Sequence, residues 1–215
     1  MFERISRREE FDLFIAWMAI SLSFAIIKIA PNGILGPIKS VDPIVALIYL
    51  GISLLTVGIG FILHEMAHKF TAIRYGYWAE FRKDNSMLLI AVALASLVGF
   101  VFAAPGATVI YSNDSRGLSR EQNGKISAAG PVVNLLLCIP FAGLVLIGGT
   151  IMNTSNNILS QIGIFGIQIN AMIAAFNMLP ISILDGRKVI SWNMPVFALL
   201  IIASFGLLVG SFYIF

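Results

Sequence analysis

Long apolar runs constrain this chain more than any other feature of its sequence. A helix needs about 20 mainly apolar residues to cross the hydrocarbon core of a bilayer. Six stretches approach that length, and short groups of turn-forming residues separate them. The sequence therefore predicts an all-α, multi-pass membrane protein with about five to six transmembrane helices. The stretches cover residues 11–29, 44–70, 87–104, 127–149, 159–179 and 195–215.

The overall composition excludes a water-soluble globule. Hydrophobic residues make up 58% of the chain and charged residues only 12%, whereas soluble domains carry roughly 25% charged residues. The formal net charge is +3, but no basic run or aromatic-interleaved patch accompanies it. We therefore expect no nucleic-acid partner. Loops that stay in the cytoplasm collect Lys and Arg, which explains the excess. The expected surroundings are the lipid bilayer.

The basic residues also predict which side of the membrane each loop occupies. Four polar segments are basic, and the positive-inside bias places all four in the cytoplasm. Full crossing by every apolar stretch would put the basic segments 74–83 and 116–125 on opposite sides. We therefore expect residues 87–111 to form a re-entrant element that returns to the same side, with 107–111 as a short strand beside a cavity. In the alternative, 87–104 crosses fully and another element does not.

The second apolar stretch contains the residues that best indicate chemistry. His64 and His68 are four residues apart, so on a helix both imidazoles project from one face and can share a metal ion. Glu65 follows His64 directly and is the candidate general base. His64 and His68 are the only two histidines in the chain. A polar side chain inside an apolar membrane helix costs free energy, so such residues usually have a function. The alternative is a pair of hydrogen-bonded core histidines beside a solvated glutamate.

A third metal ligand is expected to be a carboxylate. Catalytic zinc usually has three protein ligands and keeps a fourth position for water. The chain has no third histidine, and its single cysteine, Cys138, lies in an apolar run. Asp185 ends an apolar stretch on the same predicted side as the histidines, and Gly186 beside it permits a sharp turn. Asp185 is therefore the candidate ligand, the alternative being an N-cap or loop carboxylate paired with Arg187.

Three short motifs follow one another along the chain. They are H-E-M-A-H at residues 64–68, G-P-V-V-N at 130–134 and N-M-L-P-I-S-I-L-D-G at 177–186. Together they resemble the site-2 protease family of intramembrane zinc metalloproteases, in the order found in that family. The resemblance covers residues 44–188. It implies a Zn²⁺ cofactor, Asp185 as its third protein ligand, and a membrane-spanning protein segment as substrate.

Two asparagines and one valine are further site candidates. The amide of Asn134 could stabilise a developing oxyanion, and that of Asn177 could bind the substrate backbone. The alternatives are an interhelical hydrogen bond or, for Asn177, a brace for the loop before Pro180. Val109 lies in the predicted strand, whose edge could hold an extended substrate by β-augmentation.

These features predict one membrane-embedded domain over residues 1–215, with a core at 44–188 and peripheral spans at 11–30 and 195–215. The expected function is that of an intramembrane zinc metalloprotease, hydrolysing peptide bonds in or near transmembrane segments of its protein substrates. We expect the chain in the cell membrane of a prokaryote, with its active site nearer the cytoplasmic side. The sequence leaves the oligomeric state open. The alternatives are a membrane metal transporter and a non-catalytic relative that binds membrane helices.

Overall fold

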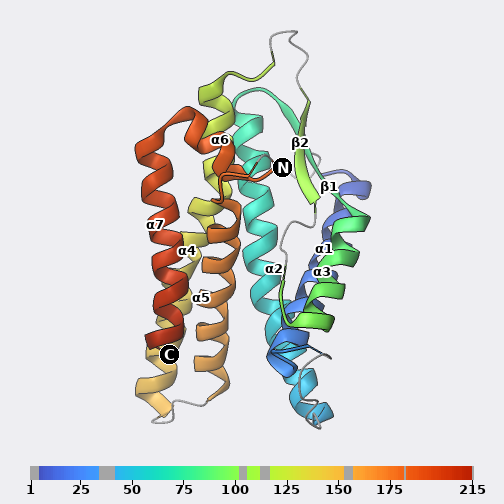
Figure 1. Cartoon of the computed structure of the whole chain (residues 1–215), viewed down its shortest axis with the longest axis vertical. Helices are drawn as coiled ribbons and strands as arrows, with labels where there is room; N and C mark the ends of the chain where they lie inside the picture. The colour runs from blue at the N-terminus through green and yellow to red at the C-terminus, as the bar shows by residue number, and fades with distance from the viewer. Residues whose placement is uncertain are drawn as a thin grey trace. The chain divides into compact units, whose positions relative to one another are not determined.

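The computed structural model describes residues 5–33, 42–101, 106–111, 117–152, 157–181 and 183–214. Within these residues the chain forms helices and one pair of strands (Figure 1). In chain order the elements are α1 (Arg7–Ile29), α2 (Pro43–Arg74), β1 (Trp78–Lys83), α3 (Asn85–Val98), β2 (Gly106–Tyr111), α4 (Arg120–Met152), α5 (Ile158–Asn177), α6 (Asp185–Trp192) and α7 (Met194–Ile214).

Five of the described helices are long and apolar enough to cross a membrane, namely α1, α2, α4, α5 and α7. The predicted fold class of a helical, multi-pass membrane protein is therefore confirmed. Helix α3 is apolar but has only 14 residues. At 1.5 Å per residue it is roughly 21 Å long, short of a hydrocarbon core of about 30 Å.

Helix α3 lies between two strands that pair with each other. Because β1 and β2 form a two-stranded sheet, the chain leaves this sheet through α3 and returns to it. The strands lie so close that a Cβ atom at Gly106 would stand 2.2 Å from the carbonyl oxygen of Arg82. This out-and-back path is the one expected of a re-entrant element, and the predicted strand 107–111 lies within β2. Residues 102–104 of the predicted stretch 87–104 lie outside the described residues.

Polar side chains fix where two of the helices begin. Asp84 accepts a hydrogen bond from the backbone N–H of Ser86 (2.9 Å), so β1 stops and α3 starts at this point. Asn157 accepts from the backbone N–H of Ser160 (2.8 Å) at the start of α5. Each cap satisfies a donor that a helix start would otherwise leave unpaired, an effect of about 1 kcal/mol.

Contacts between residues divide the chain into two compact units, the first of which comprises Met1–Ile62 and Glu80–Val109. Helices α1 and α3 pack against each other in this unit. The buried carboxylate of Glu9 accepts a hydrogen bond from the backbone N–H of Phe81 (3.0 Å), which ties α1 to β1. The backbone N–H of Phe81 is therefore bonded to a side chain of α1 and not to a neighbouring strand.

The second unit comprises Leu63–Ala79 and Ile110–Phe215. In it α4, α5 and α7 run side by side, and α6 packs against α4 and α7 (Figure 1). Helices α4 and α5 approach closely, since a Cβ atom at Gly166 would lie 2.1 Å from the ring of Phe141. The single-domain interpretation of the sequence stays a prediction. Among the described residues of this unit, three groups of buried apolar side chains form clusters. The first is Ala128, Met178, Val189, Phe197 and Leu200, the second Cys138, Phe141, Ile167 and Ala171, and the third Ala72, Ala79 and Ile126.

Candidate metal centre

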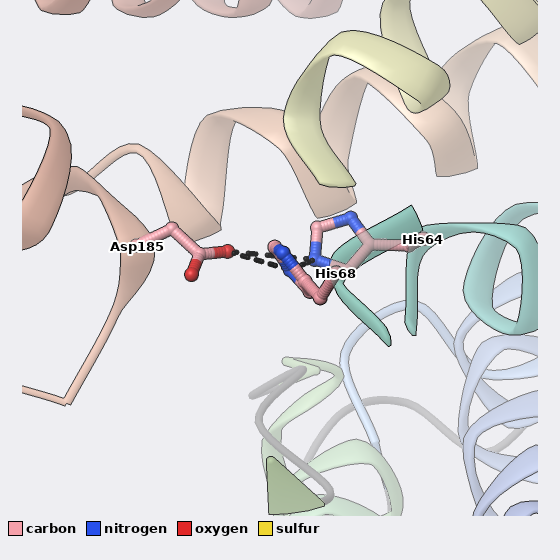
Figure 2. A group of neighbouring side chains, drawn as sticks. All are labelled: His64, His68 and Asp185. Atoms are coloured by element: carbon pink, nitrogen blue, oxygen red, sulfur yellow. Dashed lines mark hydrogen bonds and ion pairs between the residues drawn. The ribbon is translucent and has the colours of Figure 1, made fainter. Parts of the chain in front are cut away.

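Three buried side chains converge in the second unit. His64 and His68 lie one turn apart on α2, and Asp185 is the first residue of α6. The Nε2 atoms of the two histidines are 3.0 Å apart. Oδ2 of Asp185 lies 3.1 Å from Nε2 of His68 and 3.6 Å from Nε2 of His64 (Figure 2). Among the residues that the structure describes, no other group of three His, Cys, Asp or Glu side chains is close enough to hold one ion.

The outer nitrogen of each imidazole is held by an oxygen atom from α4. Nδ1 of His68 lies 2.8 Å from the backbone carbonyl oxygen of Ile126. Nδ1 of His64 lies 2.5 Å from the side-chain oxygen of Asn134. A carbonyl oxygen can only accept, so Nδ1 carries the hydrogen in both rings and each Nε2 presents a lone pair. Histidines that bind a metal ion commonly have such a partner at their second nitrogen.

Three acceptor atoms that face one another require a positive charge between them. Two nitrogen lone pairs and a carboxylate oxygen repel one another at the observed separations of 3.0, 3.1 and 3.6 Å. A tetrahedral zinc ion with ligands at about 2.0–2.2 Å would separate its ligand atoms by roughly 3.3–3.6 Å. Two imidazoles and one carboxylate are also the kind of donor set that catalytic zinc sites use. The three residues therefore fit a metal ion of this kind.

Gly130 of α4 leaves the space beside these donor atoms open. A Cβ atom at this position would lie 2.5 Å from Nε2 of His68 and 2.6 Å from Nε2 of His64. Both distances are far shorter than the roughly 3.5–4.0 Å at which non-bonded atoms attract each other. Gly130 and Asn134 belong to the same motif, G-P-V-V-N at residues 130–134. This motif therefore places a residue without a side chain against both Nε2 atoms and places an asparagine against the ring of His64.

Gly130→Ala is expected to prevent binding of a metal ion, because the new methyl group would fill the space at both Nε2 atoms. Overpacking also costs about 1–3 kcal/mol, so the metal-free variant should unfold at a lower temperature. Gly143→Ala on the same helix is the control, since a Cβ atom there meets nothing within 4 Å. Metal content of the purified variants, measured by mass spectrometry, checks this prediction. A Gly130→Ala protein with as much metal as the wild type would contradict it.

Asp185 reaches the imidazoles because α6 begins directly against the end of α5. A Cβ atom at Gly186 would lie 2.2 Å from the carbonyl oxygen of Met178, so only glycine allows this contact. The sharp turn expected at Gly186 is not what the structure shows, since Gly186 lies in the first turn of α6 without a positive φ. The second oxygen of Asp185 lies 3.8 Å from Nζ of Lys188, whereas the alternative interpretation of the sequence paired this carboxylate with Arg187.

The carboxyl group of Asp185 is held in its ionised form. Burial alone would raise the pKa of Asp185, but in the metal-free site the positive charge of a protonated His68 ring and hydrogen bonds from both rings outweigh burial and hold this pKa well below its usual range. The start of α6 contributes in the same direction, because the positive end of a helix dipole favours an anion. Ionised carboxylate is the form that binds a metal ion.

Two further candidates lie near these ligands, Glu65 in the chain and Asn134 in space. Glu65 is buried on α2, directly after His64. Asn134 is fully buried on α4 and bonds Nδ1 of His64, so its amide supports a candidate ligand. The role of Asn134 at an oxyanion stays a prediction, as does the role of Glu65 as general base.

The other two candidates have different surroundings. The amide of Asn177 donates to the carbonyl oxygen of Ile173 one turn earlier in α5 (3.0 Å). Val109 is exposed on β2 and belongs to the first unit. Their roles in binding a substrate stay predictions.

Asn170 is a site residue that no sequence motif indicated. It is fully buried on α5, and its side-chain oxygen accepts a hydrogen bond from the amide of Asn134 (2.8 Å). One signal in the sequence pointed to it, because Asn170 interrupts the apolar run 159–179 and polar residues inside a membrane span are usually functional. Its partner could not be read from the sequence.

The fold and the site together define a class of protein. It is a multi-pass membrane protein with two histidines and a glutamate in H-E-x-x-H spacing and an aspartate converging on the histidines. This arrangement is typical of metal-dependent proteases.

Two proteins similar to this chain both carry the name "Putative zinc metalloprotease". MJ0611 of Methanocaldococcus jannaschii is 39% identical over 196 residues, which are 91% of this chain and 90% of the relative. YwhC of Bacillus subtilis is 29% identical over 165 residues, which are 71% of this chain and 72% of the relative. The chain therefore belongs to the zinc metalloprotease family that includes MJ0611. No family model and no solved structure matches it.

Proposed function

We propose that this chain is an intramembrane metalloprotease of the site-2 protease family. It binds Zn²⁺ through His64, His68 and Asp185 and hydrolyses peptide bonds in or near transmembrane segments of other proteins. The convergence of these three side chains carries the proposal. The names of the relatives support a metalloprotease. Intramembrane action is supported by α2, which carries both histidines and is itself long and apolar enough to span a bilayer.

Each residue of the proposed site has its own role in peptide hydrolysis. When bound, Zn²⁺ supplies Lewis acidity that lowers the pKa of a water molecule from its value in bulk water towards about 7 and polarises the scissile carbonyl group. Glu65 takes the proton of the attacking water and returns it to the leaving amine. Asn134 and the carbonyl of Ile126 hold the two imidazoles in the orientation in which Nε2 faces Asp185. Burial of these groups strengthens each electrostatic interaction among them.

A transmembrane substrate must be locally extended before it is cut, because a helix shields its own peptide bonds. An exposed strand edge can hold an extended peptide by β-augmentation. Glu9 already occupies part of the edge of β1 through its bond to the N–H of Phe81. We assign β2 to the substrate, because every second side chain of this strand is exposed.

Val109→Pro is expected to lower kcat/KM for a transmembrane peptide by about 3–10-fold, since one net hydrogen bond contributes about 0.5–1.5 kcal/mol. Proline removes the backbone N–H and fixes φ. Val109→Ala, which keeps the N–H, is the control and should cleave almost as fast as the wild type. The rate of fragment release, followed by electrophoresis, measures the effect. Unchanged cleavage by Val109→Pro would exclude the strand edge as the substrate site.

We place the chain in the cell membrane of a prokaryote, with the site nearer the cytoplasm, because its basic segments gather near the ends of the helices that carry the ligands. A cysteine introduced at Ser119 should then react with a membrane-impermeant maleimide only from the cytoplasmic side. The native Cys138 is buried and gives little background. Labelling from outside intact cells would reverse this orientation.

A metal transporter is the main rival function. It would use the same three ligands to pass an ion but gives Glu65 no specific task. Purified protein in liposomes separates the two functions. A protease releases fragments from a transmembrane peptide and loses that activity in Glu65→Gln, whereas a transporter moves zinc across the bilayer in both forms.

A further inference from the structure

Asn170 of α5 ends a line of buried hydrogen bonds that begins at His64. Nδ2 of Asn170 donates to the backbone carbonyl oxygen of Gly166 (2.8 Å). Oδ1 of Asn170 accepts from Nδ2 of Asn134 (2.8 Å). Oδ1 of Asn134 in turn accepts from Nδ1 of His64 (2.5 Å). Both asparagines are fully buried, so water does not compete for these bonds.

The direction of the whole line is fixed at its Gly166 end. A backbone carbonyl oxygen can only accept, so Asn170 must turn its NH₂ group towards Gly166 and its oxygen towards Asn134. Asn134 must then donate to Asn170 and turn its own oxygen towards His64. The line is complete only when Nδ1 of His64 carries a hydrogen. In that tautomer Nε2 is left as a lone pair facing His68 and Asp185.

His68 is held in the same tautomer by one direct hydrogen bond. Nδ1 of His68 donates directly to a backbone carbonyl, that of Ile126, and a backbone carbonyl cannot change its orientation within a helix. The partner of His64 is a side-chain amide, which can rotate and offer either its oxygen or its NH₂ group. The orientation of the Asn134 amide therefore matters for His64, and Asn170 is a residue that holds this amide.

We propose that Asn170 is a positioning residue of the metal centre, which acts through Asn134 to fix His64 with its hydrogen on Nδ1 and Nε2 free to bind the ion. This inference rests on the proposed function, because it takes a metal ion as the ligand of Nε2. Without Asn170 the amide of Asn134 loses the hydrogen bond to Oδ1 of Asn170, which favours the orientation with its oxygen towards His64, and its NH₂ group can turn towards His64. The ring then favours a hydrogen on Nε2, and that tautomer cannot bind a metal ion.

The first test reads the tautomer directly in metal-free protein. Because the chain has only two histidines, ¹⁵N-histidine labelling yields the ring signals of His64 and His68 alone. In the wild type, at a pH high enough that neither imidazole carries an extra proton, both rings should show a protonated Nδ1 and a bare Nε2. In Asn170→Ala, the signals of His64 should move towards the tautomer with a protonated Nε2. The signals of His68 should stay unchanged, which makes that ring an internal control.

The second test measures affinity for zinc by competition with a chelator. Asn170→Ala should bind zinc about 10–100-fold more weakly, the usual effect of losing a partner of a metal ligand. Asn170→Leu, which fills the volume of the amide, should show the same loss if the alanine variant does not fold. Ser204→Ala is the control, since Ser204 is equally buried and bonds the carbonyl of Leu200 one turn earlier, as Asn170 bonds Gly166.

A double variant separates positioning from helix packing. If Asn170 acts through Asn134, Asn134→Ala and Asn134→Ala/Asn170→Ala should bind zinc equally weakly, because both break one line of hydrogen bonds. Additive losses would overturn the proposal, and so would folded Asn170 variants with wild-type ring signals and wild-type zinc affinity. A wild-type protein that binds no zinc would instead overturn the proposed function. The ring signals of the metal-free protein would still decide the role of Asn170 in setting the tautomer.

Discussion

Glu65→Gln is expected to lose peptide cleavage while it keeps its zinc. Glutamine has nearly the same shape as glutamate but cannot accept a proton, and general acid–base catalysis contributes about 10²–10⁴-fold to a rate. The ligands His64, His68 and Asp185 are untouched by this change. Fragment release from a transmembrane peptide and zinc content per chain should be measured on the same purified sample.

Glu121→Gln serves as the matched control for Glu65→Gln. Glu121 lies on the surface of α4, where it pairs with Lys125, and its substitution should change neither cleavage nor zinc content. Wild-type cleavage by Glu65→Gln would remove the general base from the mechanism. It would favour a transporter or a protein that only binds membrane helices.

Asp185→Ala is expected to lose both zinc and cleavage. Two imidazoles would remain, and catalytic zinc sites usually need three protein ligands. The loss should be seen first as zinc content near background after purification, and then as cleavage no faster than in the absence of enzyme. Restoring the carboxylate one methylene further out, in Asp185→Glu, should recover part of the zinc, because that group also ligates zinc.

Arg187→Ala on the same helix is the control for Asp185→Ala. Arg187 is exposed and lies two residues further along α6, so its substitution should leave zinc and cleavage at wild-type levels. If Asp185→Ala retained its zinc, another residue would have to be the third ligand, and Asp185 would not belong to the metal site.

Much of the fold and the ligand set could be predicted from the sequence because the relevant signals are local. Apolar runs of about 20 residues predict spans from length alone. The four-residue spacing of His64 and His68 follows the period of one helix, so their common face needed no knowledge of packing. Asp185 could be selected because the chain offers few carboxylates at the end of an apolar stretch.

The features that escaped prediction all depend on how helices pack. The bond between Asn134 and His64 joins residues 70 positions apart, and neither local pattern shows which way each helix is rotated. The carbonyl of Ile126 carries no side-chain signal at all, although it holds His68 as Asn134 holds His64. Gly186 was expected to permit a turn, whereas its role is to let α6 approach the end of α5. Backbone contacts of this kind become visible only in three dimensions.

X-ray absorption at the zinc edge of the purified protein tests whether His64, His68 and Asp185 bind the ion. We expect one zinc ion per chain with nitrogen and oxygen ligands at about 2.0–2.2 Å, two of them imidazoles, and no sulfur at about 2.3 Å. The single cysteine, Cys138, lies in an apolar cluster with Phe141 and Ile167, so it should contribute nothing to the spectrum. A sulfur ligand, a single imidazole, or a chain that takes up no zinc would show that these three residues do not form the metal site.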